Sequence, residues 1–256
     1  MMSVRPKKHL GQHFLVDENI ARKIVGSLSH GINNVLEVGP GRGVLTRYLV
    51  PLFPSLQIVE IDDESVRYLK ETFPQISEKI IHGDFLKTNL SGLFPERFSI
   101  IGNFPYNISS QILFHIIDHR DQVTEVVGMF QKEVAERIAS PPGSKKYGIL
   151  SVLTGAFYDI EYLFSVSETV FYPHPNVKSA VIRMTRNKTV RMECDEAFFF
   201  KVVKTAFNQR RKTLRNALRS LSNEKVVSDP VFSLRAEQLS IQDFIRLTNL
   251  LETAFY

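Results

Sequence analysis

The chain has 256 residues, of which 43% are hydrophobic and 23% charged, and these values suit a globular protein with one large domain or with a large and a small one. No apolar run approaches the roughly 18 residues that span a bilayer, and no secretory signal is visible, so we expect a cytoplasmic protein without a membrane partner. The single cysteine, Cys194, excludes a disulfide framework and a cysteine-based metal site, so no metal is expected, and the net charge of +5 weakly favours a nucleic-acid partner.

Hydrophobic periodicity predicts an alternation of helices and strands along most of the chain. The predicted helices cover residues 17–29, 43–53, 63–73, 110–118, 132–139 and 149–157. The predicted strands cover residues 34–38, 57–61, 79–82, 98–102 and 123–130, and two strand-like runs follow at 159–167 and 177–185. This alternation predicts an α/β fold, in which a mostly parallel sheet has helices on both faces.

The strand pattern stops near residue 188, and the rest of the chain has a helical pattern. We therefore predict two domains, 1–187 and 188–256, of which the second is small and all-helical. Ser240 is the expected N-cap of its last helix. The loop 140–148, rich in proline and glycine, interrupts the first domain and is expected to be mobile.

Positive charge is concentrated in residues 201–220, where seven basic residues occur without an acidic one. On a helix, four of them form one stripe: Lys204, Arg211, Arg215 and Arg219. One interpretation is a solvated helix face. The lack of acidic residues between the like charges favours the other interpretation, in which the stripe binds the phosphates of RNA or DNA.

The segment "VLEVGPGRGVL" combines a strand, a glycine-rich turn and the start of a helix. Gly39 and Gly41 let the backbone turn sharply and approach a ligand at the carboxyl end of the sheet. Glu60 ends the second strand and can take both hydroxyls of a ribose, and Asp84 follows the third strand and can accept from an adenine amino group. A carboxylate at a strand end can also be a helix cap, which is what we expect of Asp63. Together these strand ends predict a site for an adenosine-bearing cofactor.

The stretch "GNFPYNISS" lies between a predicted strand and a predicted helix. The side-chain oxygen of Asn103 and the carbonyl of Phe104 can accept from the N6 amine of adenine and favour the form with a free lone pair. Pro105 restricts Phe104 to an extended conformation, and Tyr106 offers a ring on which a base can stack. The alternative is an ordinary strand-to-helix turn. Beside an adenosine site, the stretch favours methylation of an adenine amine, with S-adenosylmethionine, which has no phosphates, as the cofactor.

Several motifs carry a resemblance to one family. "NFPYNIS" resembles the N-[LIF]-P-Y signature of adenine-N6 methyltransferases, and "KKHLGQHFL" is similar to the N-terminal motif of ribosomal RNA adenine dimethyltransferases. Further matches, in order, are "VLEVGPGRGVLT", "VEID", "GDFL", "SPPGSKKYGILSV", "FYPHPNVKSAVIR", "AFNQRRKTLRNAL" and "RAEQLSIQDF". Over nearly its whole length the chain resembles the bacterial small-subunit (16S) rRNA adenine dimethyltransferases, whose loss confers kasugamycin resistance.

The resemblance implies a Rossmann-like class I methyltransferase fold with a seven-stranded sheet and a helical C-terminal domain. It also implies that S-adenosylmethionine serves to dimethylate N6 of two adjacent adenosines in the 3′-terminal hairpin loop of 16S rRNA. The partner would be this RNA within the 30S subunit or its precursor, with a role in ribosome biogenesis. Nothing in the sequence demands more than a monomer.

The resemblance further implies roles for individual residues. The cofactor contacts would be His13, Leu15, Gly39, Gly41, Glu60, Asp84 and Asn103. His13 stands where asparagine is usual, and a neutral imidazole can still donate or accept a hydrogen bond. The catalytic group would be Asn103, Phe104, Pro105, Tyr106 and Phe171. Phe171 would hold the target base from the side opposite Tyr106, although a core residue at a strand start is the alternative.

The RNA contacts implied by the resemblance are Lys7, Lys8, Lys145 and Lys146, together with the basic stripe. Two rival functions remain at this level. One is a large-subunit (23S) rRNA dimethyltransferase of the macrolide-resistance type, and the other is a non-catalytic RNA-binding assembly factor. The presence of Glu60, Asp84 and Asn103 argues against a complete loss of catalysis.

Overall fold

The computed structural model describes residues 4–223 and 226–253 and divides the chain into two compact units. The first unit takes in Met1–Ala135 and Asp159–Arg186, and the second takes in Glu136–Tyr158 and Asn187–Tyr256. The predicted first domain, 1–187, included the stretch Glu136–Tyr158. In the structure this stretch groups instead with the C-terminal residues, which the prediction placed in domain 188–256.

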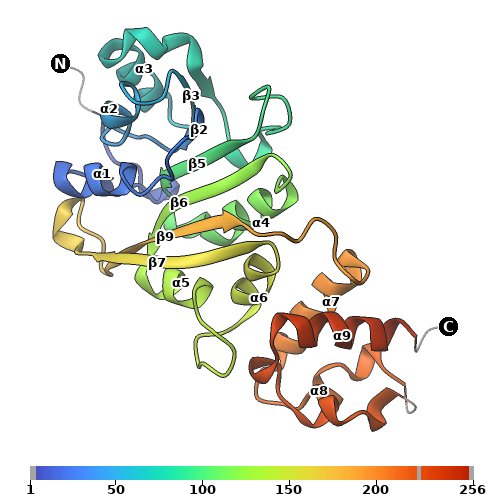
Figure 1. Ribbon diagram of the computed structural model, residues 1–256. Coiled ribbons are helices and arrows are strands. Elements are labelled where there is room, and N and C mark those ends of the chain that lie inside the picture. The colour runs from blue at the N-terminus through green and yellow to red at the C-terminus, as the bar shows by residue number, and fades with distance from the viewer. Residues whose placement is uncertain (1–3, 224–225, 254–256) are drawn as a thin grey trace. The chain divides into compact units, whose positions relative to one another are not determined.

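The main feature of the first unit is a sheet of seven strands in the order β4-β3-β2-β5-β6-β9-β7 (Figure 1). The strands are β2 (Asn34–Val38), β3 (Ser55–Glu60), β4 (Ile80–His82), β5 (Phe98–Asn103), β6 (Val123–Gln131), β7 (Tyr158–Val166) and β9 (Ser179–Arg186). The pairs from β4 to β6 are parallel, and β9 runs antiparallel to β6. This confirms the predicted mostly parallel sheet, and a two-stranded sheet of β1 (Phe14–Leu15) and β8 (Phe171–Tyr172) lies apart from it.

The central strands are buried on both faces. All five residues of β2 are buried, as are the first five of β5, because a parallel strand covered by helices on both sides reads as a continuous apolar run. The strand order reverses at β2, which has β3 on one side and β5 on the other. Such a reversal opens a crevice at the carboxyl ends of the strands.

The helices of the first unit begin at side-chain caps where the sequence offers them. Asp17 accepts from the backbone of residues 19 and 20 and starts α1 (Glu18–Val25). Asp62, and not the expected Asp63, caps α3 (Asp63–Thr72). The helix expected over 43–53 is only α2 (Thr46–Leu49), since turns fill the glycine-rich side and Pro51 lacks the N–H that would continue it. The remaining helices are α4 (Ser109–Asp118) and α5 (Lys132–Ile138), which crosses into the second unit.

The described part of the second unit is mainly helical, apart from the start of β7 and a bridge between Thr213 and Arg235. It contains α6 (Ile149–Gly155), α7 (Glu196–Asn208), α8 (Leu214–Ala217) and α9 (Ile241–Glu252). Ser240 is the N-cap of α9, as predicted, and accepts from the Asp243 backbone. Within the described ranges, no helix is both long and apolar enough to cross a membrane.

The prediction of one helix through the basic stretch is wrong. The helix α7 ends at Asn208, and Thr213 is extended and bridges Arg235 while the Leu214 N–H bonds to the carbonyl of residue 234. Because the backbone at Thr213 and Leu214 pairs with residues 234 and 235, it cannot form the hydrogen bonds that would continue α7. Arg211 therefore lies in a turn and Arg215 on α8, so the four predicted residues do not share a helical stripe.

The loop 140–148, expected to be mobile, is tied down within the second unit. The Gly143 N–H donates to the Glu237 carbonyl over 2.7 Å. The Arg210 guanidinium donates to the Glu237 carboxylate and to the backbone carbonyls of Ser144 and Lys145. Arg210 therefore acts as a structural clamp on this loop.

Candidate active site

A cavity of about 260 Å³ lies at the carboxyl ends of β2, β3 and β5 in the first unit. Its walls come from the N-terminal residues 9–14, the turn after β2, the ends of β3 and β5, and the loops that follow β4 and β5. It therefore occupies the crevice that the reversal of strand order predicts. Of the expected cofactor residues, His13, Gly39, Gly41, Glu60, Asp84 and Asn103 line it.

The turn after β2 leaves space beside its backbone and holds a carboxylate in place. Gly39 has φ +66°, and a β-carbon built there would meet nothing within 4 Å. Glu60 is 4% exposed, and its two oxygens accept from the N–H groups of Gly41 at 3.0 Å and Asp62 at 2.9 Å. Burial raises the pKa of Glu60, while these backbone hydrogen bonds oppose the rise. The carboxylate is thus fixed in direction at the cavity wall.

Asp84 is a helix cap and also lines the cavity. It follows β4 and caps the short 3-10 turn Phe85–Lys87, with its Oδ1 accepting from the Leu86 N–H at 3.0 Å. The same residue is half-buried in the cavity wall. The cap orients the carboxylate and leaves its second oxygen as an acceptor for a ligand.

Asn103 is oriented by the N-terminal segment. Its side-chain nitrogen donates to the backbone carbonyl of His13 over 2.9 Å. Since a carbonyl can only accept, the amide nitrogen must face it, which makes the Asn103 oxygen the free acceptor of the pair. A polar acceptor therefore stands at the end of β5 in the cavity wall.

Phe104 is anchored in a slot made by two glycines that face each other across β5 and β6, Gly102 and Gly128. A β-carbon at Gly128 would lie 2.4 Å from the Phe104 ring, and one at Gly102 would lie 2.9 Å from it. The ring is 1% exposed, and the Phe104 N–H bonds to the Met129 carbonyl at 3.1 Å. This seat fixes the backbone of the loop that leads into Pro105.

Tyr106 is held at both ends. Its hydroxyl lies 2.5 Å from the Oγ of Ser179, which is fully buried at the start of β9. Burial raises the pKa of Tyr106, and the Ser179 bond opposes the rise. The His13 imidazole stacks on its ring with 5.5 Å between centroids and 23° between planes. Nδ1 of His13 lies 2.8 Å from the Pro173 carbonyl, so that nitrogen carries the proton.

Two predicted site residues are placed elsewhere. Phe171 is completely buried in the hydrophobic core with Val166 and Val181, as in the alternative that placed it in the core, and its ring is not exposed to the cavity beside Tyr106. The Leu15 side chain is 4% exposed in the same core and does not line the main cavity. Both belong to the small β1–β8 sheet, where they pair directly and face inward.

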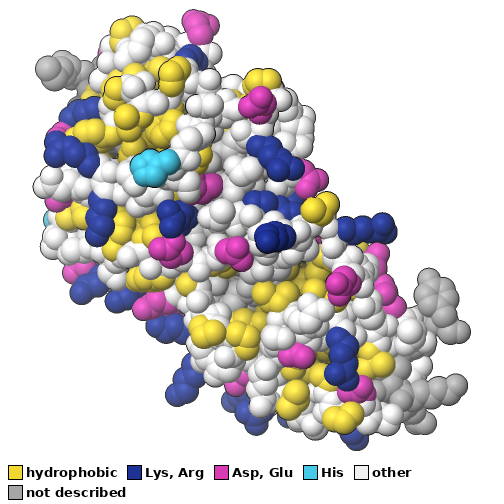
Figure 2. Space-filling view, in the orientation of Figure 1, with side chains coloured by type: hydrophobic (Ala, Val, Ile, Leu, Met, Phe, Trp, Pro, Cys, Tyr) yellow, Lys and Arg dark blue, Asp and Glu magenta, His cyan; other side chains and the backbone are white. Residues whose placement is uncertain are grey.

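The predicted phosphate contacts differ in how far their charges are available. Lys7 is paired with the buried Asp62 and with Glu64, and Lys146 is paired with Glu136. The others are exposed: Lys8, Lys145, Lys204, Arg211, Arg215 and Arg219. Figure 2 shows lysine and arginine side chains spread over the visible face with acidic ones between them, and not gathered into one patch.

Sequence reasoning missed two polar residues near the site. Glu37 is fully buried within β2, accepts from the Thr46 hydroxyl at 2.6 Å, and has its pKa raised to about 8 by burial. It lines a smaller cavity behind the glycine turn with Gly39 and Asn103. An acidic residue inside an apolar strand is a signal that could have identified it. Ser179 carries no such signal, because only the fold brings it to Tyr106.

Comparisons with known proteins give one consistent result. A family model described as "Ribosomal RNA adenine dimethylase" matches residues 4–253. A "Ribosomal RNA small subunit methyltransferase A" of Cytophaga hutchinsonii is 58% identical, covering 98% of this chain and 99% of its own. The protein of the same description from Flavobacterium johnsoniae is 56% identical, covering 98% of each.

Two solved structures are similar over nearly the whole chain. A dimethyladenosine transferase from Plasmodium falciparum has a TM-score of 0.76 at 25% identity, with 94% of this chain and 97% of that one covered. The 23S rRNA methyltransferase ErmE has a TM-score of 0.67 at 24% identity, with 93% and 99% covered. The second likeness shows the fold alone.

Proposed function

The chain belongs to the ribosomal RNA adenine dimethylase family, and from this premise we infer that it is a methyltransferase that dimethylates N6 of adenosines in small-subunit ribosomal RNA. The family match and the solved structures confirm the predicted class I methyltransferase fold. The observation that carries the function is the full-length match to small-subunit methyltransferases, joined to an Asn-Phe-Pro-Tyr loop seated at the cavity.

The finer substrate is part of the proposal. We place the reaction on two adjacent adenosines in the 3′-terminal hairpin loop of 16S rRNA, within the 30S subunit or its precursor in the cytoplasm. Relatives more than half identical to the chain bear the small-subunit name, which supports this choice. The large-subunit alternative has less support, since ErmE is similar at 24% identity and in fold only.

S-adenosylmethionine fits the main cavity by the chemistry of its walls. The free space beside Gly39 suits the methionine part, the fixed carboxylate of Glu60 suits the ribose hydroxyls, and the second oxygen of Asp84 suits the adenine amine. His13 and Asn103 would close the wall on the side of the reaction. When bound, the cofactor supplies an activated methyl group on a sulfonium.

The chain's own residues would orient the acceptor amine. The Asn103 oxygen and the Phe104 carbonyl accept from the two N–H groups of N6 and leave its lone pair directed at the methyl carbon. Stacking on Tyr106 adds roughly 1–3 kcal/mol per base. The cofactor would supply the methyl group and keep the electron pair of the broken carbon–sulfur bond, and N6 would release one proton to solvent for each methyl group that it gains. No general base is needed, because the amine is positioned and not deprotonated in advance.

The RNA would be held by the exposed cations, with Lys8 from the first unit and Lys145, Arg211, Arg215 and Arg219 from the second. Each neutralised phosphate releases counterions, so binding should weaken steeply with salt. Flipping the adenosine out of its loop would bring it to the cavity. A monomer suffices for these roles.

A tritiated methyl-transfer assay tests the function. The wild-type chain is expected to label undermethylated 30S particles at adenine N6 and to leave 50S particles unlabelled. Asn103→Ala and Tyr106→Ala should abolish labelling while the circular dichroism spectrum stays unchanged, and Tyr162→Ala, an aromatic truncation outside the cavity wall, should retain it. Label on 50S particles alone, or full activity in both site variants, would refute the proposal.

A further inference from the structure

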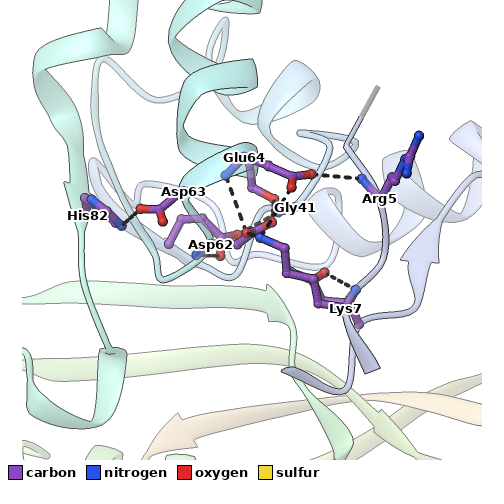
Figure 3. A network of polar contacts seen from close by, with 10 residues as sticks. Arg5, Lys7, Gly41, Asp62, Asp63, Glu64 and His82 are labelled. Carbon is purple, nitrogen blue, oxygen red and sulfur yellow. Dashed lines mark hydrogen bonds and ion pairs between the residues drawn. The ribbon is translucent and has the colours of Figure 1, made fainter. Parts of the chain in front are cut away.

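Lys7 is already paired with two carboxylates, unlike a surface cation that is available to bind phosphate. Its ammonium group reaches Asp62, whose side chain is fully buried, and lies 3.7 Å from Glu64 (Figure 3). The Lys7 side chain itself is only 28% exposed. Burial alone would raise the pKa of Asp62, but hydrogen bonds from Lys7 and Ser65 outweigh it and hold that pKa below its usual range. Asp62 is therefore a buried anion whose partner cation is Lys7.

The Lys7 backbone also holds the turn of the N-terminal strap, which we define as residues 7–13. Its N–H donates to the Gln12 side-chain oxygen at 2.9 Å, and its carbonyl accepts from the Leu10 N–H at 3.1 Å. The Gln12 side chain in turn helps to lower the pKa of Asp62. Holding Lys7 therefore holds the turn that follows it.

The strap is a wall of the cavity. Its residues from His9 to His13 line it, and the His13 carbonyl takes the hydrogen bond that orients Asn103. The strap thus reaches the amide that we assign to the reaction. A change in its position would move both the cavity wall and the acceptor oxygen.

The anchor of the strap is continuous with the carboxylate expected to bind ribose. The Asp62 N–H donates to Glu60 at 2.9 Å, while the Asp62 carboxylate caps α3 and pairs with Lys7. Figure 3 shows Arg5 and Lys7 on one side of this network and Gly41 beside Asp62 at its centre. A second tie joins the Arg5 N–H to the Glu64 carboxylate at 3.4 Å.

Moving Lys7 onto an RNA phosphate would leave Asp62 buried without its cation, which is unfavourable. The neighbouring Lys8 is exposed, and no buried carboxylate among the described residues depends on its charge. The two adjacent lysines, both expected from sequence to bind RNA, are therefore placed in different environments. That difference supplies a matched pair for an experiment.

We propose that Lys7 is a positioning residue of the cofactor site, which pins the N-terminal strap to the buried Asp62 beside Glu60, and that Lys8 alone of the pair contacts RNA phosphate. The inference rests on the proposed function, because it treats the main cavity as the cofactor site. Lys7 acts through the strap and touches neither cofactor nor RNA.

The test compares Lys7→Met with Lys8→Met, since methionine keeps the length of the side chain and removes the charge. Titration calorimetry measures the affinities for S-adenosylmethionine and S-adenosylhomocysteine, and filter binding measures the affinity for the 16S 3′-terminal hairpin. Lys7→Met should weaken both cofactor affinities by about tenfold, the order expected for one charge-assisted hydrogen bond. It should leave the RNA affinity unchanged, and Lys8→Met should show the reverse pattern.

Hydrogen exchange on the ligand-free proteins gives an independent readout. The amides of Leu10 and Gln12 should exchange faster in Lys7→Met and as in wild type in Lys8→Met. Lys7→Arg, which keeps the charge, should restore both protection and cofactor affinity. The inference is overturned if Lys7→Met keeps cofactor affinity and strap protection, or if it lowers RNA affinity as Lys8→Met does.

The failure of the proposed function would look different. If wild type transfers no methyl group to 30S particles or binds no S-adenosylmethionine, the function fails. The exchange measurement on the ligand-free chain would still decide whether Lys7 holds the strap.

Discussion

The Asn103 side-chain nitrogen lies 2.9 Å from the backbone oxygen of His13 and donates a hydrogen bond to it. This single bond joins the N-terminal strap to the end of β5, two segments that are 90 residues apart in the chain. It also decides which end of the Asn103 amide faces the cavity.

Asn103→Asp should remove activity without unfolding the chain. The aspartate keeps an oxygen but has no N–H for the His13 carbonyl, and its charge would face that oxygen. We expect kcat to fall by at least about a hundredfold, as when a positioned polar group is lost from an active site, with a melting temperature close to wild type. Asn19→Asp, the same change at an exposed residue of α1, is the control and should be fully active. An active Asn103→Asp enzyme would show that the orientation is irrelevant.

Ser179 should matter only through Tyr106. Ser179→Ala removes the partner of the half-buried Tyr106 hydroxyl and should raise the KM for RNA, because the stacking ring loses its fixed plane. In the Tyr106→Phe background the same change should have no further effect. A double-mutant cycle on kcat/KM should therefore give a coupling energy of about 1 kcal/mol. Additive effects would mean that the two side chains act separately.

Gly128→Ala should dislodge the Phe104 ring. The new β-carbon would lie 2.4 Å from that ring, too close for the present packing. Overpacking of this kind costs about 1–3 kcal/mol of unfolding free energy, and the loop shift should lower kcat more than stability. Adding Phe104→Leu removes this clash, leaves one with the Phe130 ring at 2.6 Å, and should recover part of the activity. Wild-type kinetics in Gly128→Ala alone would contradict the seat that we assign to Phe104.

Glu37 should make stability fall as pH rises. Burial raises its pKa from 4.5 to about 8, so between these values the folded chain keeps a proton that the unfolded chain has lost. Stability relative to Glu37→Gln is then highest below pH 4.5 and declines by roughly 1 kcal/mol per pH unit until about pH 8. Urea denaturation of both proteins at pH 5, 6 and 7 measures the difference. A gap that does not change with pH would place the Glu37 pKa near its ordinary value.

Phe171 should behave as a core residue. Phe171→Ala removes a completely buried ring and should lower the unfolding free energy by about 3–5 kcal/mol. Phe171→Leu should cost less than about 1.5 kcal/mol and keep its RNA affinity. Urea denaturation and filter binding distinguish a core role from a stacking role. In a stacking role, Phe171→Leu would lose RNA affinity while its stability stayed nearly unchanged.

The fold was largely predictable where periodicity and caps agree. The strand predicted at 34–38 is β2 to the residue, and the N-caps Asp17 and Ser240 begin helices as their residue types favour. The helix predicted over 43–53 covers only Thr46–Leu49, because the glycine turns before it and Pro51 after it stop the helix despite its apolar face. The break after Asn208 depends on a bridge to Arg235 far along the chain, which no local pattern contains.

The candidate site was predictable where its residues lie at strand ends. Strand ends point to Glu60 and Asn103 because parallel strands bring their carboxyl ends to one edge. The environments of Phe171 and Lys7 were not predictable from residue type, because they depend on partners that are distant in the sequence. Val181 and the other core residues bury Phe171, and Asp62 pairs with Lys7.

The reversal of strand order at β2 has a consequence for how such an enzyme can change. Glu60 and Asp84, which we assign to the cofactor, stand on the β3 and β4 side, and the loop assigned to the acceptor base stands on the β5 and β6 side. Mutations that redirect the protein to another nucleotide can accumulate in one half while the other half continues to hold the same methyl donor. The fold thus separates what must stay constant in evolution from what is free to diversify.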